Sequence, residues 1–129
     1  MNKKFFYITI FTVIIIIISG CSAKKTFYFS TDQFKDTYET VSKDEFPDNI
    51  IVKDASITLN DGTIDQAVYV LHTLERTLNN QEFITLSEEL LAAKGIFSSE
   101  LVASKVYVGI SAENEGNIRI NILPDDKAE

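Results

Sequence analysis

The chain has 129 residues, of which 45% are hydrophobic, and its formal net charge at pH 7 is -7. This length builds one domain and excludes the two-domain cleft of transport-type solute-binding proteins. The acidic charge argues against nucleic-acid binding, because phosphate backbones repel a negatively charged protein. Cys21 is the single cysteine, so no intramolecular disulfide can form and the fold must depend on its core.

The N-terminal segment is organised as a secretory signal. Lys3 and Lys4 give it a positive start, and Phe5 to Ile18 form an apolar run interrupted only by two threonines. As a helix this run would span ~21 Å, whereas a hydrocarbon core of ~30 Å needs about 20 residues. The run therefore indicates a signal segment rather than a permanent membrane span.

Residues 1–21 resemble the signal peptide and lipobox of bacterial lipoproteins. The resemblance is carried by Ile18, Ser19 and Gly20, which would precede the cleaved bond, and by Cys21. It implies cleavage after Gly20, a diacylglyceryl thioether on Cys21, and acyl chains such as palmitate inserted in the membrane. Leu is commoner than Ile at the position of Ile18. The alternative is an uncleaved N-terminal anchor with an incidental cysteine.

This resemblance divides the chain and places the protein. We expect a cleaved signal peptide at 1–20, the lipidated cysteine and a tether at 21–26, one domain at 27–123, and a polar tail at 124–129. Cleavage would leave 109 residues with a formal charge of -9, because the signal carries two lysines and no acid. The expected location is the extracytoplasmic face of the cell membrane. The abundance of lysine, isoleucine and asparagine indicates a Gram-positive host with an AT-rich genome.

Early in the mature chain, the pattern predicts a short strand at 26–29 and then a helix from Ser30 or Thr31 to about Lys43. Phe34 and Tyr38 lie on one stripe of this helix, and we interpret them as core rather than as a binding face. A break follows at 46–49.

Residues 50–59 are rich in strand-forming side chains. Ile50 and Val52 share one phase of the alternation, and Ile57 and Leu59 share the opposite phase, so Lys53-Asp54 marks a bulge or a tight turn. The next three residues, 60–62, are expected to form a turn.

The clearest helix follows, opening at Thr63 with the capping-box pattern Thr63-x-x-Gln66 and stopping near Asn79-Asn80. Its apolar positions recur at the helical period: Ile64, Ala67, Val68, Leu71, Leu74 and Leu78. A second capping-box pattern, Thr85-x-x-Glu88, predicts a further helix that ends at Lys94-Gly95. The alternative for Phe83-Ile84, just before the capping box, is a brief strand.

Two alternating segments around 106–110 and 118–122 predict a hairpin over 105–123 with a glycine-bearing loop at 113–117. The order of elements predicts an α+β fold, a small antiparallel sheet with two or three helices packed on one face. We expect the core to form where Val68, Leu71, Leu74 and Leu78 pack on the inner face of this hairpin.

No catalytic or metal site is predicted. His72 is the single histidine and lacks an evident nucleophile or orienting acid, so we interpret it as a surface or rim residue. One imidazole without a free cysteine does not make a zinc site. The spacing before Gly116 approaches a calcium loop, but its twelfth position holds Ile122 instead of Glu. Paired acids elsewhere are interpreted as solvated surface charge.

These features favour a non-enzymatic, membrane-anchored surface protein that acts by protein contact, as an accessory subunit or an immunity factor of the cell envelope. Its expected partners are the membrane and an envelope protein, with no nucleic acid, metal or cofactor. A small-ligand or peptide binder is the alternative, and a hydrolase ranks below both.

Overall fold

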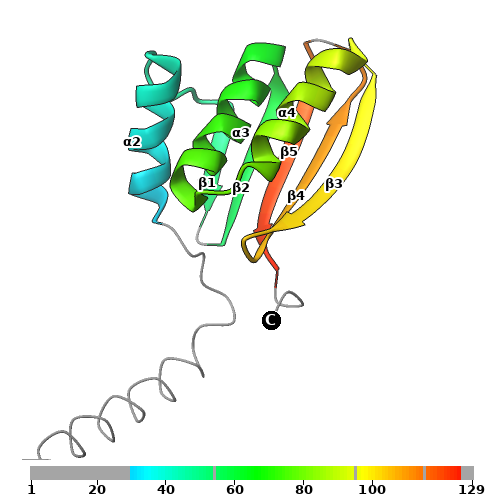
Figure 1. Cartoon of the computed structure of the whole chain (residues 1–129). Helices are drawn as coiled ribbons and strands as arrows, with labels where there is room; N and C mark the ends of the chain where they lie inside the picture. Colours follow the sequence, from blue (N-terminus) through cyan, green and yellow to red (C-terminus); the bar gives the residue numbers. More distant parts are fainter. Residues whose placement is uncertain (1–29, 54, 95, 115, 126–129) are drawn as a thin grey trace, which may run out of the picture.

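The computed structural model describes residues 30–53, 55–94, 96–114 and 116–125. Five antiparallel strands form one sheet in the order β1-β2-β5-β4-β3, and three helices lie side by side along one of its faces (Figure 1). The predicted α+β class is thereby confirmed. The elements are α2 (Thr31–Ser42), β1 (Ile50–Lys53), β2 (Ser56–Gly62), α3 (Ile64–Leu78), α4 (Glu82–Ala93), β3 (Phe97–Ala103), β4 (Val106–Ala112) and β5 (Ile118–Pro124).

Several sequence predictions fall outside the described residues. These are the signal segment, the lipobox with Cys21, the tether, the expected strand at 26–29, and positions 126–129 of the tail. Within the described part of the chain, no helix combines the length and the apolar character that a membrane crossing requires.

Helix α2 starts and stops where the sequence predicts. The hydroxyl of Ser30 accepts a hydrogen bond of 3.0 Å from the backbone N–H of Gln33, which caps the first turn. Lys43 ends the helix in the left-handed conformation, with a φ of 62°. Phe34 and Tyr38 are both buried, and their ring centroids lie 6.5 Å apart. These two aromatic residues therefore belong to the core, as predicted.

Helix α3 has the predicted capping box. The Thr63 hydroxyl accepts a hydrogen bond from the N–H of Gln66, and the Gln66 side chain accepts one from the N–H of Thr63, each 3.1 Å long. The helix ends at a left-handed Asn79, and α4 likewise ends at a left-handed Lys94. Both stops match the sequence prediction.

The buried face of α3 differs in part from the predicted one. Leu71 and Leu74 are fully buried, as expected, whereas Val68 and Leu78 are only partly buried. Helix α3 lies between α2 and α4, so it contacts these two helices as well as strands β2 and β5 of the sheet. The other buried positions on the helix are Ala67, Val70 and Thr73.

Helix α4 begins earlier than the second capping-box pattern predicts. The Oδ1 atom of Asn80 accepts a 3.0 Å hydrogen bond from the N–H of Glu82, and the helix starts there. Thr85 lies inside the first turns, where its N–H donates to the carbonyl of Gln81. Phe83-Ile84 is therefore helical rather than a strand. The early start places the ring of Phe83 fully inside the core.

The first hairpin explains the change of phase between residues 50–52 and 57–59. Strands β1 and β2 pair so that Ile50 faces Leu59 and Val52 faces Ile57, with a tight turn after Lys53. Reversal of the chain in this turn brings both pairs to the same face of the sheet. The tight-turn alternative is therefore correct.

Residues 60–62 do not form the predicted turn. Strand β2 continues to Gly62, which pairs with Ile118, and a bulge shifts the register after Leu59. Asp61 adopts a φ of 46° within this bulge, a conformation that Asp tolerates better than most residues. The turn-like composition thus marks an irregularity inside a strand.

The predicted hairpin over 105–123 is confirmed as β4 and β5, which pair from Val106 to Ala112. The strand before it, β3, has no counterpart among the predicted elements. Ser104 and Lys105 connect β3 to β4, and both have positive φ angles, of 53° and 62°. Two central residues with positive φ are typical of a type I′ hairpin turn.

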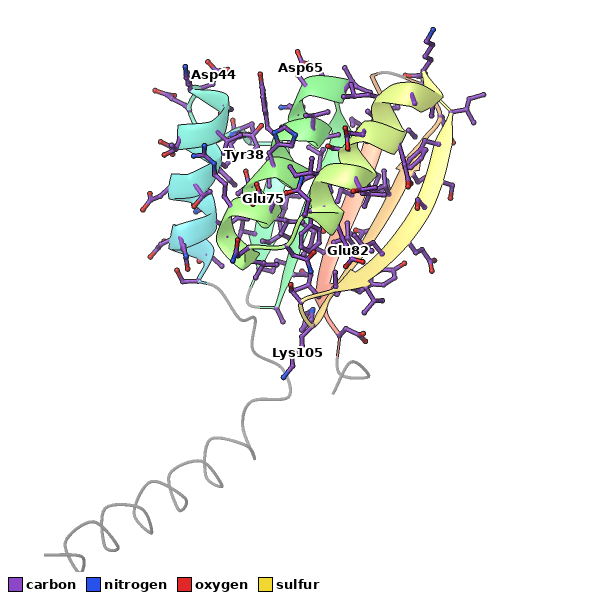
Figure 2. All side chains as sticks on the ribbon, in the orientation of Figure 1. Tyr38, Asp44, Asp65, Glu75, Glu82 and Lys105 are labelled. Atoms are coloured by element: carbon purple, nitrogen blue, oxygen red, sulfur yellow. The ribbon has the colours of Figure 1, made fainter. Side chains whose placement is uncertain are left out.

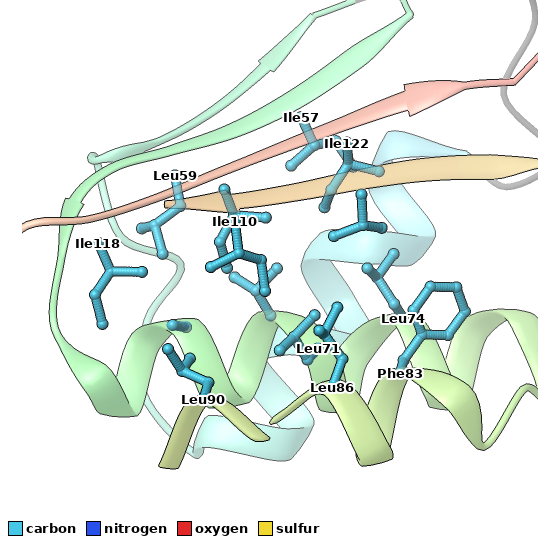
Figure 3. Packing of buried hydrophobic residues seen from close by; sticks show 14 of the residues in the cluster. Ile57, Leu59, Leu71, Leu74, Phe83, Leu86, Leu90, Ile110, Ile118 and Ile122 are labelled. Atoms are coloured by element: carbon cyan, nitrogen blue, oxygen red, sulfur yellow. The ribbon is translucent and has the colours of Figure 1, made fainter. Parts of the chain in front are cut away.

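One continuous core fills the space between the sheet and the helices (Figure 3). Aliphatic side chains from β2, β4 and β5 meet those of α3 and α4, because alternate strand residues point to the helix side. The labelled members of this cluster are Ile57, Leu59, Leu71, Leu74, Phe83, Leu86, Leu90, Ile110, Ile118 and Ile122. The opposite face of the sheet carries no described helix.

Candidate functional site

The residues singled out in the sequence do not come together. Ile18, Ser19, Gly20 and Cys21 lie outside the described range. His72 is half-buried in the middle of α3, where it joins no cluster of candidate metal ligands among the described residues.

The acidic pairs are also dispersed. Asp44-Glu45 lies in the connection between α2 and β1, Glu88-Glu89 on α4, and Glu113 after β4. In the part of the chain that the structure describes, no three His, Cys, Asp or Glu side chains are close enough together to hold a metal ion.

On the face of the sheet that the helices leave uncovered, the pairing register of the strands determines which side chains are neighbours. Directly paired residues project to the same side, so side chains form rows across β3, β4 and β5. One row holds Val102, Tyr107 and Leu123, in which Val102 is 51% and Leu123 41% exposed. The adjacent row holds Glu100 and Gly109. An apolar row therefore borders a position without a side chain.

A hollow of about 200 Å³ lies beside Gly109 on these strands. The Tyr107 side chain covers Gly109 at the margin of this hollow: a Cβ atom placed on Gly109 would lie 2.9 Å from the Tyr107 hydroxyl oxygen. Desolvation raises the pKa of Tyr107, and its hydrogen bond to Glu100 adds to the rise. The hollow is lined by Ser98, Ser99, Glu100, Tyr107, Gly109, Ile110, Ser111, Arg119 and Asn121.

A second hollow of about 480 Å³ lies on the other side of β3, between this strand and α4. We call it the α4–β3 groove. Helix α4 contributes Glu82, Thr85, Leu86 and Glu89, and strand β3 contributes Ser99, Glu100 and Leu101. Figure 2 labels Glu82 at the N-terminal end of α4. The groove thus combines two leucines with the carboxylates of Glu82 and Glu89.

Both hollows share Ser99 and Glu100, so they meet on β3. Strand β3 is at the end of the sheet and pairs only with β4 among the described strands. We use the name β3 margin for residues 97–103 together with the two hollows. This margin is the candidate site, because it joins exposed backbone, hydroxyl groups and carboxylates in one place.

The β3 margin is hard to recognise in the sequence for a physical reason. Every second residue of β3, from 97 to 103, faces the helices. Three of these four positions are apolar (Phe97, Leu101 and Ala103), but the fourth is Ser99. That serine hides the period-2 pattern. The available signal was the alternation of the other three residues just before the Ser104-Lys105 turn.

The margin is suited to recognition. Its hydroxyls and carboxylates accept hydrogen bonds, its exposed strand offers backbone groups, and its leucines offer apolar contact. Searches of protein-family models, curated proteins and solved structures found no match to this chain.

Proposed function

We propose that this protein is a lipid-anchored extracytoplasmic protein that acts by binding another polypeptide rather than by catalysis. The observation that carries the binding function is the exposed seven-residue strand β3, which has a hollow on each side. Exposed strands of this length are templates for pairing with another chain, and proteins that do not use them commonly cover or shorten them.

The anchor is supported by the sequence. The lipobox residues before Cys21 and the apolar run ahead of them have the order that lipidation requires. The chain from Cys21 to Ser30 reaches at most ~32 Å, so an anchored domain stays close to the bilayer. Two acyl chains at ~0.8 kcal/mol per buried methylene give lasting attachment, whereas a single chain binds marginally.

A small-ligand binder is the second candidate, and the hollow over Gly109 is the observation in its favour. Its volume of about 200 Å³ is below the ~300–1,000 Å³ of typical ligand pockets. This difference counts against a small ligand in that hollow.

Site-specific photocrosslinking in native membranes tests the binding function. A photoreactive phenylalanine analogue replaces Val102 on β3 or, as a matched control, Ile51 on β1. The two side chains are comparable, because both face away from the helices on terminal strands, with exposures of 51% and 42%.

We expect a reproducible polypeptide adduct from position 102 and little from position 51. Equal adducts from both positions would indicate random collisions and contradict the proposed binding surface. Absence of any adduct at 102 in cells that process the protein normally would count against the function itself.

A further inference from the structure

We propose that the partner contributes an extended segment bearing lysine or arginine, which pairs with β3 as a sixth strand and lies in the α4–β3 groove. The inference rests on the proposed function and specifies its binding mode and the chemistry of the partner. Addition of a strand to a sheet edge is a known mode of peptide recognition, in which backbone hydrogen bonds give affinity and flanking side chains give selectivity.

The two ends of the sheet differ in their capacity for this pairing. Strand β3 has seven residues, Phe97–Ala103, whereas β1 at the other end has four, Ile50–Lys53. In an edge strand, alternate residues direct both backbone N–H and C=O away from the sheet. A longer strand therefore offers more hydrogen bonds, and β3 is the better template.

The groove beside β3 provides contacts for the side chains of an added strand. Its α4 residues, at positions 82, 85, 86 and 89, share one helix face because they are spaced by three and four residues. Leu86 is almost fully buried and Leu101 partly buried, so they form an apolar floor. Apolar side chains of the partner would contact this floor.

The glutamates around the groove favour basic side chains at the remaining positions of the partner segment. The groove lining contains the carboxylates of Glu82 and Glu89 on α4 and, among the described residues, no lysine or arginine. Glu100 of β3 adds a third acid at the same edge, with its carboxylate on the uncovered face beside Tyr107. A basic segment complements these charges, and an acidic segment would place like charges together.

The same charges argue against a second copy of this chain. Glu100 is the central residue of β3. Antiparallel pairing of two β3 strands about their centres would place the two Glu100 side chains directly opposite each other. Like charges in directly opposed positions destabilise a strand pair. A partner of different sequence is therefore the favoured occupant.

The test measures peptide binding to the full lipidated protein in non-ionic detergent. The probe is a fluorescent, end-capped heptapeptide of alternating lysine and valine, compared with a glutamate–valine peptide and a lysine–valine peptide N-methylated at every second residue. We expect the basic peptide to bind about tenfold or more tightly than either control, with affinity falling as salt rises. N-methylation removes backbone donors and keeps the charge, so it isolates the strand pairing.

Two matched variants locate the binding. The triple substitution Glu82→Gln, Glu89→Gln and Glu100→Gln removes the acidic charges on both faces of the β3 margin while keeping polar side chains of similar size. The control substitutes Glu39→Gln, Glu88→Gln and Glu113→Gln, three exposed glutamates outside the groove, for the same change in net charge. We expect the groove variant to lose about tenfold in affinity for the basic peptide and the control to lose less than about twofold.

Equal losses in the two variants would overturn the proposal, because they would indicate attraction to a generally acidic surface. So would equal binding of the N-methylated peptide, or self-association of the protein through β3 in sedimentation measurements. If the lysine–valine peptide does not bind but the photoreactive residue at position 102 still gives a polypeptide adduct, the binding mode is wrong and the proposed function stands. If both fail, the function is wrong as well.

Discussion

At the scale of single residues, the amides of Asn49 and Gln66 tie the first hairpin to helix α3. The Gln66 side chain accepts a hydrogen bond from the Nδ2 atom of Asn49 at 2.9 Å and donates one to its Oδ1 atom at 3.0 Å. Gln66 also caps the helix at Thr63, and Asn49 donates to the carbonyl of Asn60. Two side chains thus fix the start of β1, the end of β2 and the first turn of α3.

Tyr38 gives a prediction of pH dependence. Burial raises its pKa from 10.0 to about 12, with further contributions from Asp44 and Tyr69. Between these values the unfolded chain loses the phenolic proton while the folded protein keeps it. The stabilising contribution is therefore complete below pH 10 and is lost as pH rises toward 12, by an amount on the order of 2 kcal/mol.

Urea unfolding of the wild type and Tyr38→Phe between pH 9 and 12 measures this loss. The variant should lack most of the decrease in the free energy of unfolding over this range. Tyr107→Phe is the necessary control, because the Tyr107 pKa is also raised. An identical slope in wild type and Tyr38→Phe would show that another group titrates.

At the scale of elements, the two capping-box patterns illustrate what a local sequence signal decides. Thr63 and Gln66 form the box at the start of α3. The equivalent pattern at Thr85 is overridden, because an earlier start of α4 buries the ring of Phe83. Burial of a large side chain contributes ~1.5–3 kcal/mol, whereas a cap contributes ~1 kcal/mol. Burial of Phe83 therefore determines where the helix starts.

Matched substitutions test this comparison. Thr63→Ala should lower the free energy of unfolding by about 0.5–2 kcal/mol, because it removes a cap. Thr85→Ala should change it by less than about 0.5 kcal/mol, because that exposed threonine makes no cap. Denaturant unfolding of both variants gives the two values. Equal losses would mean that Thr85 also caps α4.

The buried face of α3 provides a second stability test. Leu71→Ala should cost ~2–5 kcal/mol, since Leu71 is fully buried against the sheet and the helices. Val68→Ala is the comparison on the same helix and should cost less, because Val68 is only partly buried. Thermal or denaturant unfolding would contradict the described core if the order of these two losses were reversed.

At the scale of the whole molecule, the sequence predicts the α+β class, helices α2 and α3 and the β4–β5 hairpin, because their periodic patterns coincide with burial. It does not predict β3, in which Ser99 interrupts the inward-facing set, or the bulge at Asp61, whose composition matches a turn. The candidate site depends on register across three strands and on the packing of α4 beside β3. Both features bring together residues that are distant in the sequence, so no short sequence motif indicates them.

The proposed anchor is tested by Cys21→Ser. This substitution removes the thiol that would carry the diacylglyceryl group, so we expect an uncleaved precursor that takes up no fatty-acid probe in labelled cells. The wild-type protein should be cleaved and labelled. Normal processing and labelling of the variant would exclude the lipoprotein assignment, and Ser22→Ala serves as the control for a change beside the site.

Amide hydrogen exchange of the full-length protein, with and without the lysine–valine peptide, shows directly whether β3 is the edge to which a partner strand adds. At saturating peptide, we expect slower exchange of backbone amides in β3, residues 97–103, and unchanged exchange in β1, residues 50–53. Unchanged exchange in β3 at saturation, or protection confined to β1 or to α2, would contradict the addition of a strand at β3.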